Sequence, residues 1–173
     1  MLLLLSAHVL LGEDAKGLWI DVPFVAQPNE GCGAASIAMV MQYWSRHDRQ
    51  GNGPDVEQVF HALHSDSAHG IYASDMVRYF KQSGYRTFAF AGESADLLQH
   101  LAKGRPLIAA LKLGAGLPLH YVVVAGVDPQ DHTVLLNDPA QRKLLKEDDA
   151  RFEREWKAAG HWTLLALPVS APH

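Results

Sequence analysis

The segment from residue 32 to residue 44 places the strongest constraint on how this chain can fold. Alanine, isoleucine, methionine and valine occupy most positions from Cys32 to Tyr43, and Trp44 follows directly. A helix that is apolar on nearly every face is stable only when other elements cover it on all sides. The sequence therefore predicts a buried central helix that begins at Cys32.

The composition supplies enough apolar material to cover such a helix. Of the 173 residues, 48% are hydrophobic and 20% are charged, as expected of one globular domain. From Leu18 onward there is no internal repeat and no linker long enough to separate two cores. We therefore expect a single domain over residues 18–170.

The first 17 residues have a different character. Residues 2–5 and 9–11 are apolar, but the stretch is too short to span a bilayer. We expect residues 1–17 to be a secretory signal or a disordered segment, with an ordinary strand as the alternative. Charged or polar residues interrupt every later apolar run, so we expect no integral membrane segment in the mature chain. The apolar start favours a secreted or periplasmic location, whereas an unpaired thiol would suit the cytosol.

Charge and cysteine count exclude several classes of protein. Fifteen Lys and Arg against 19 Asp and Glu give a formal charge of -4, which leaves no basic excess for nucleic acid. The single cysteine cannot form an internal disulfide or a metal site of several thiolates. One thiol remains to be explained.

The apolar periodicity places helices mainly before strands. An edge strand or extended lead-in is expected at 19–25, and a solvated hairpin or helix entry at 143–149. Ser74 is expected to cap a helix that ends at Gly84. The other predicted helices are 54–63, 94–102 and 152–156, and the strands are 85–90, 106–113, 120–127, 133–136 and 162–167. This order predicts an α+β fold with a largely antiparallel sheet.

Cys32 has the sequence context of a nucleophile. The start of a helix places unpaired N–H groups and a partial positive charge beside the thiol, which favours the thiolate. Gly31 and Gly33 flank it, and neither has a Cβ to obstruct an approaching substrate. The alternative is a cysteine that only packs, because free cysteines often behave as small hydrophobic side chains.

Three other polar residues could complete a thiol active site. Gln27 precedes Cys32 across a turn-like stretch, so its amide could stabilise an oxyanion, although glutamine is also common in plain surface loops. His120 opens a strand after a flexible loop, with the access that a general base needs. Asp138 ends the adjoining hairpin strand, where pairing could bring its carboxylate to the imidazole. Together the four residues fit nucleophile, base, orienting acid and oxyanion donor.

Four motifs of the chain follow one another in a characteristic order. They are Asp21-Val22-Pro23-Phe24 with Gln27 and Cys32-Gly33-Ala34-Ala35-Ser36, then Gly104-Arg105-Pro106-Leu107-Ile108, then the run from His120 to Asp128, and finally Asn137-Asp138-Pro139. This set resembles the papain-like cysteine peptidases that cleave double-glycine leader peptides from bacteriocins, and their stand-alone relatives. The resemblance extends from about Leu18 to Leu167.

The resemblance implies a papain-like fold with N-terminal helices packed on a C-terminal sheet. It implies that Cys32 attacks a carbonyl, that His120 transfers the proton and that Asp138 holds the imidazole. Gln27 and the Cys32 backbone N–H would form the oxyanion hole. The reaction would be hydrolysis of a peptide or isopeptide bond in a peptide or protein substrate, through a thioester and without a metal or organic cofactor. The members best known for leader cleavage are fused to a membrane transporter, so double-glycine specificity is not expected here.

Two other functions use the same residues. The triad could serve acyl transfer or amide hydrolysis on a non-peptide, or the chain could bind a peptide without cutting it. His61, His64 and His69 have a spacing that could suit a metal. We interpret them as solvated polar residues, because 65–67 has the composition of a loop and no carboxylate completes a ligand set.

Overall fold

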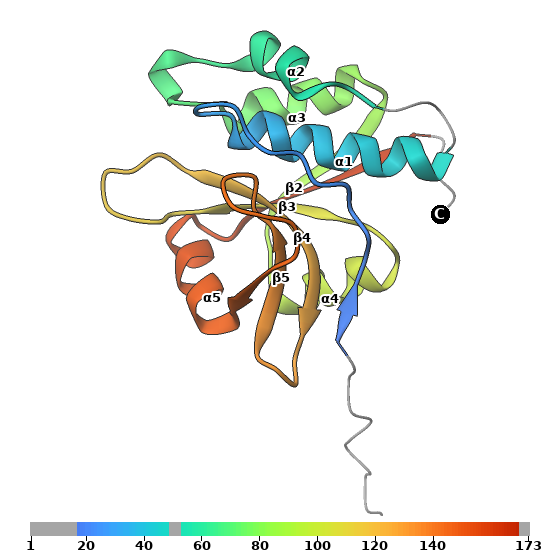
Figure 1. Ribbon diagram of the computed structural model, residues 1–173, viewed down its shortest axis with the longest axis vertical. Helices are drawn as coiled ribbons and strands as arrows, with labels where there is room; N and C mark the ends of the chain where they lie inside the picture. The colour runs from blue at the N-terminus through green and yellow to red at the C-terminus, as the bar shows by residue number, and fades with distance from the viewer. Residues whose placement is uncertain (1–16, 49–52, 170–173) are drawn as a thin grey trace, which may run out of the picture.

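The computed structural model describes residues 17–48 and 53–169 (Figure 1). The expected signal or disordered segment, 1–17, therefore lies outside the described residues apart from Gly17. In chain order the elements are β1 (Leu18–Trp19), α1 (Cys32–Asp48), α2 (Val56–Leu63), η1 (Asp66–Ala68), α3 (Ala73–Gln82), β2 (Tyr85–Ala91), α4 (Ser94–Ala102), β3 (Leu107–Leu111), β4 (His120–Asp128), β5 (Thr133–Asn137), β6 (Leu145–Asp148), α5 (Asp149–Ala158) and β7 (Trp162–Pro168).

The strands form one sheet in the order β2-β7-β3-β4-β5-β6, with β1 paired to β4. Every pairing is antiparallel. Figure 1 shows α1, α2 and α3 gathered above the sheet, while α4 and α5 lie beside its lower part. The predicted α+β class and the largely antiparallel sheet are confirmed.

The central helix is buried as its composition predicts. All residues of α1 from Gly33 to Met41 are buried. Two polar side chains of α1 bond to backbone carbonyls of the sheet: Ser36 Oγ donates to Tyr121 O at 3.2 Å, and Trp44 Nε1 donates to Ala166 O at 3.0 Å. The helix is thereby fixed over the centre of the sheet, and its first residue lies near the start of β4.

One local prediction differs from the structure, and two others are met in one of their alternatives. The helix expected to be capped by Ser74 begins at Ala73, with Tyr72 as the capping position and no side-chain cap, so Ser74 lies inside the helix. At 19–25 the extended lead-in is the alternative that fits, because β1 ends at Trp19 and the rest of the stretch is not a strand. The stretch 143–149 does lead into a helix, since Asp148 is the N-cap of α5, but it also contains the edge strand β6, which was not expected because its second inward residue, Glu147, is charged.

Candidate active site

Cys32 is the first residue of α1 and is partly exposed. Its Sγ lies 4.0 Å from the carbonyl oxygen of Leu119, the residue before β4. The turn that leads into the helix is closed by Gly31 N donating to Pro28 O at 2.9 Å. A Cβ on Gly31 would lie 2.5 Å from Pro28 Cδ, so the structure requires glycine there for packing rather than for substrate access.

His120 and Asp138 meet where two neighbouring strands end. His120 begins β4, and Asp138 directly follows β5, in a register that pairs Val123 with Asn137. His120 Nε2 and Asp138 Oδ1 are 2.8 Å apart, with both side chains largely buried. The structure thus brings together the two residues that the sequence predicted to pair.

The surroundings of this pair stabilise its charged forms. Burial lowers the pKa of His120, but hydrogen bonding to Asp138 and to Cys32 outweighs burial and raises the pKa to about 9. Burial likewise raises the pKa of Asp138, yet the hydrogen bond from His120 and further donors hold it below its ordinary value. The geometry therefore favours an imidazolium between a carboxylate and the thiol group.

Two further donors fix the Asp138 carboxylate. The backbone N–H of Ala140 donates to Oδ1 at 2.9 Å, and Gln141 Nε2 donates to Oδ2 at 2.6 Å. Gln141 was not among the residues predicted from the sequence. Its position three residues after an aspartate in a turn is the pattern that could have revealed it, because a side chain there can reach back to the carboxylate.

Gln27 is joined to the acid turn through the backbone. Its N–H donates to the carbonyl oxygen of Pro139 at 3.0 Å. Its side-chain Oε1 is buried without a hydrogen-bond partner, and among the residues that the structure describes none accepts a hydrogen bond from its Nε2. The amide of Gln27 is therefore not used internally.

Asn137, which the sequence suggested only as part of the acid motif, is fully buried and ties the lead-in to the sheet. Its Nδ2 donates to Val22 O at 3.1 Å and to Pro23 O at 3.3 Å, and Leu144 N donates to its Oδ1 at 3.0 Å. No local pattern announces these contacts, because two of them cross more than 100 residues of chain.

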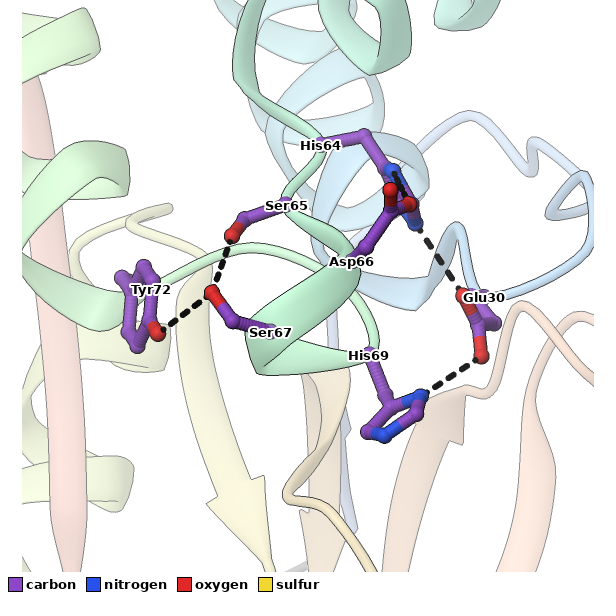
Figure 2. A network of polar contacts seen from close by, with 7 residues as sticks. All are labelled: Glu30, His64, Ser65, Asp66, Ser67, His69 and Tyr72. Atoms are coloured by element: carbon purple, nitrogen blue, oxygen red, sulfur yellow. Dashed lines mark hydrogen bonds and ion pairs between the residues drawn. The ribbon is translucent and has the colours of Figure 1, made fainter.

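Glu30, two residues before Cys32, joins two of the three clustered histidines (Figure 2). His64 Nε2 lies 3.1 Å from one carboxylate oxygen, and His69 Nδ1 lies 3.2 Å from the other. Hydrogen bonds from His64 and His69 lower the pKa of Glu30. His64 is thus less solvated than the sequence indicated, whereas His61 lies outside the network and its ring faces Phe60.

Within residues 17–48 and 53–169, no group of three or more acidic, histidine or cysteine side chains has a geometry that could hold a metal ion. The described helices include none with both the length and the apolar character needed to cross a membrane.

Comparison with solved structures shows the same fold in three proteins. A double-glycine motif protease from an AMS/PCAT transporter, solved with its leader peptide, has a TM-score of 0.67 and 23% identity, covering 87% of this chain and 94% of that one. The peptidase domain of Streptococcus ComA, a bi-functional ABC transporter of a quorum-sensing pathway, has a TM-score of 0.66 and 22% identity, covering 86% and 99%. A protein from Bacillus anthracis described as C39-like has a TM-score of 0.70 and 18% identity, covering 90% and 100%.

No curated protein sequence gives a significant match. The family model described as the Peptidase_C39 like family, however, matches residues 19–163, which includes every candidate site residue. Agreement of this match with the papain-like folds of the solved peptidases confirms the resemblance expected from the four motifs. The chain belongs to the Peptidase_C39-like family.

Proposed function

We propose that the protein is a cysteine peptidase that hydrolyses peptide or isopeptide bonds through a thioester intermediate. The observation that carries the proposal is the bond of 2.8 Å between His120 Nε2 and Asp138 Oδ1, on an imidazole that also interacts with Cys32. Because Nε2 is held by the carboxylate, Nδ1 is the nitrogen left to exchange a proton with the thiol and the leaving group.

In the proposed reaction, the thiolate of Cys32 attacks the carbonyl carbon of the scissile bond. His120 Nδ1 then protonates the leaving amine as the C–N bond breaks and the thioester forms. A water molecule then gives a proton to His120 and attacks the thioester as the C–S bond breaks, which releases the carboxylic acid and restores the Cys32 thiolate beside the protonated imidazole. Asp138 keeps the imidazole oriented and stabilises its charged form throughout.

Two donors would stabilise the oxyanion of each tetrahedral intermediate. The first N–H groups of a helix have no intrahelical acceptor, which leaves the N–H of Cys32 available. Gln27 Nε2 is similarly without an acceptor among the described residues. We assign these two groups to the oxyanion hole, where a preorganised donor typically contributes on the order of 2 to 4 kcal/mol.

The proposed substrate is a peptide or protein. The solved double-glycine motif protease was captured with a leader peptide, which supports a peptide substrate for this fold. Acyl transfer and hydrolysis of a non-peptide amide use the same groups. One experiment must therefore test the nucleophile, and a second must test which substrate is used and whether water or an amine accepts the acyl group.

Alkylation with iodoacetamide tests the proposed Cys–His pair first. Across pH 5–9 we expect the wild type to be modified at Cys32 roughly tenfold faster near pH 6.5 than an unfolded control, and His120→Ala to lose this advantage. His132→Ala is the matched control, because His132 is an exposed histidine bonded to Asp149. Equal rates in the wild type and His120→Ala would refute the pair.

A peptide library read by mass spectrometry then tests the reaction itself. Wild type should produce cleaved peptides, while Cys32→Ala should produce none. Products carrying an added amine instead of a new carboxylate would identify acyl transfer. A reactive thiol without turnover of any peptide would contradict the peptidase assignment and favour a non-peptide amide.

A further inference from the structure

An open cavity of about 1290 Å³ lies at the other end of α1 from Cys32. Trp44, which lines it, follows Cys32 by 12 residues, which corresponds to about 18 Å along the helix. The cavity also contacts β2 and β7, whose register sets Phe88 opposite Leu165. It is therefore separate from the candidate active site.

The floor of the cavity is apolar and accessible. Side chains of directly opposed residues in an antiparallel pair lie on the same face, so Phe88 and Leu165 share this surface, as do Arg86 and Leu167. Phe88 is 51% exposed, which is unusual for so large an apolar side chain in a strand. An exposed phenylalanine within a hollow is a feature of binding surfaces.

Three cations line the same cavity. Arg86 comes from β2, and Lys103 and Arg105 follow α4; in the part of the chain that the structure describes, none of the three forms an ion pair. Asp48 is the one carboxylate among the described lining residues. The chain as a whole carries a formal charge of -4, so this local excess of positive charge runs against its overall balance.

The positive charge of the cavity affects the pKa of the neighbouring His100. Burial lowers the pKa of His100, and Arg105 and Lys103 lower it further, while Asp96 acts in the opposite direction. His100 also lies beside the aromatic floor, with its ring centroid 6.4 Å from that of Phe90. An anionic group entering the cavity would meet unpaired cations beside aromatic rings.

Size and shape distinguish among possible occupants. Sites for small molecules usually enclose roughly 300 to 1,000 Å³, so this cavity exceeds what one small ligand fills. Its concave form does not suit a flat membrane surface. In addition, β2 pairs with β7 on one side only and forms an edge of the sheet, which leaves backbone groups available to an extended chain.

We propose that this cavity docks an acidic peptide segment that carries large apolar side chains, presented by a partner protein. Its carboxylates would pair with Arg86, Lys103 and Arg105, and its apolar side chains would pack on Phe88. The proposal does not depend on the peptidase assignment, since it uses none of the candidate catalytic residues.

Fluorescence anisotropy tests the docking with the full-length Cys32→Ser protein, which prevents cleavage of the probe. The probe is a fluorescein-labelled peptide of about 15 residues made of glutamate, leucine and phenylalanine. We expect saturable binding that Arg86→Glu with Arg105→Glu weakens at least about tenfold, as would Phe88→Ser. Lys146→Glu with Lys157→Glu is the matched charge control, placed on β6 and α5, and should bind like the parent.

Several results would overturn the proposal. The first is the absence of binding, and the second is equal affinity for a probe with lysine in place of glutamate. The third is a loss of affinity in the Lys146 and Lys157 control as large as that in the Arg86 and Arg105 variant. Binding of anionic phosphatidylglycerol vesicles without peptide binding would identify a lipid surface instead. Loss of self-association in the Arg86 and Arg105 variant, by sedimentation velocity, without peptide binding would identify a second copy of the chain as the occupant. Circular dichroism must show that each variant is folded before its affinity is compared.

Discussion

His120 is the residue whose protonation links the candidate site to the stability of the protein. Its ring is mostly buried, with 13% of the side chain exposed, between the Asp138 carboxylate and Cys32. Because the pKa rises from 6.5 to about 9, the folded state binds this proton more tightly than the unfolded chain does. The stabilisation is complete below about pH 6.5 and is lost as the pH rises through about 9.

Urea unfolding across pH 5–10 checks this linkage. The difference in unfolding free energy between wild type and His120→Gln should decrease by up to about 3 kcal/mol between pH 6.5 and pH 9.5. His132→Gln, altered at an exposed histidine, should show no such decrease. A difference that stays constant over this interval would contradict the charged pair.

At the residue scale, the sequence predicted the residues of the candidate site better than the neighbouring residues that hold them in place. Cys32, His120 and Asp138 stand in recognisable positions, at a helix start and at two strand ends. Gln141 supports Asp138 from three residues away, so the sequence of the turn is enough to predict this contact. Glu30 bonds to histidines more than 30 residues away, so no local pattern predicts that contact.

At the element scale, β6 and α5 form one continuous unit. The strand ends at Asp148, and the same residue caps the helix, because its Oδ1 accepts the N–H of Arg151 at 2.9 Å. Only Leu145 of the strand is buried. Burial alternates along the strand, but its second inward residue, Glu147, is charged, so the sequence shows no alternation of apolar residues, which explains why 143–149 indicated only a hairpin or a helix entry.

The Asp148 cap of α5 should contribute measurably to the stability of the protein. We expect Asp148→Ala to lower the unfolding free energy by about 1 kcal/mol, because a helix N–H loses its acceptor. Arg154→Ala, on the exposed face of the same helix, should change it by less than about 0.5 kcal/mol. Chemical denaturation at pH 7 measures both changes. Equal changes in unfolding free energy for the two substitutions would show that the Asp148 cap does not stabilise the helix.

At the scale of the whole molecule, the sheet centre is the most protected part of the structure. All five residues of β3 are buried, and β4 is buried from Tyr121 to Val127. Strands covered on both faces exchange their amide protons only when the whole domain unfolds. α2, in contrast, has one buried residue, Val59.

Hydrogen exchange followed by mass spectrometry tests this ranking. Amide protons of β3 and β4 should exchange only through global unfolding, so their opening free energy should equal the free energy of unfolding. Amide protons of α2 should exchange at least about tenfold faster. Addition of moderate urea should affect β3 and β4 strongly and α2 weakly. Exchange of β4 as fast as that of α2 would show that the sheet opens independently of the helices.

The class of fold followed from the sequence, but the order of the strands did not. Apolar runs and turn residues predicted most helices and strands, because those patterns are local. The insertion of β7 between β2 and β3 joins the end of the chain to its middle, with Arg86 opposite Leu167 and Leu107 opposite Leu165. Nothing in any single segment specifies such partners, since many strands of similar length and composition could pair.

The hydrogen bond from Gln27 N–H to Pro139 O connects the segment before the nucleophile to the turn that holds the acid. It is made by main-chain atoms alone, so exchanging the side chain at either position leaves both atoms in place. Alanine scanning therefore cannot detect the contribution of this hydrogen bond. Replacing the amide N–H of Gln27 by an ester oxygen, through semisynthesis, would remove the donor and keep both side chains. Homologous sequences could likewise diverge at residue 139 while the two halves of the site stay joined.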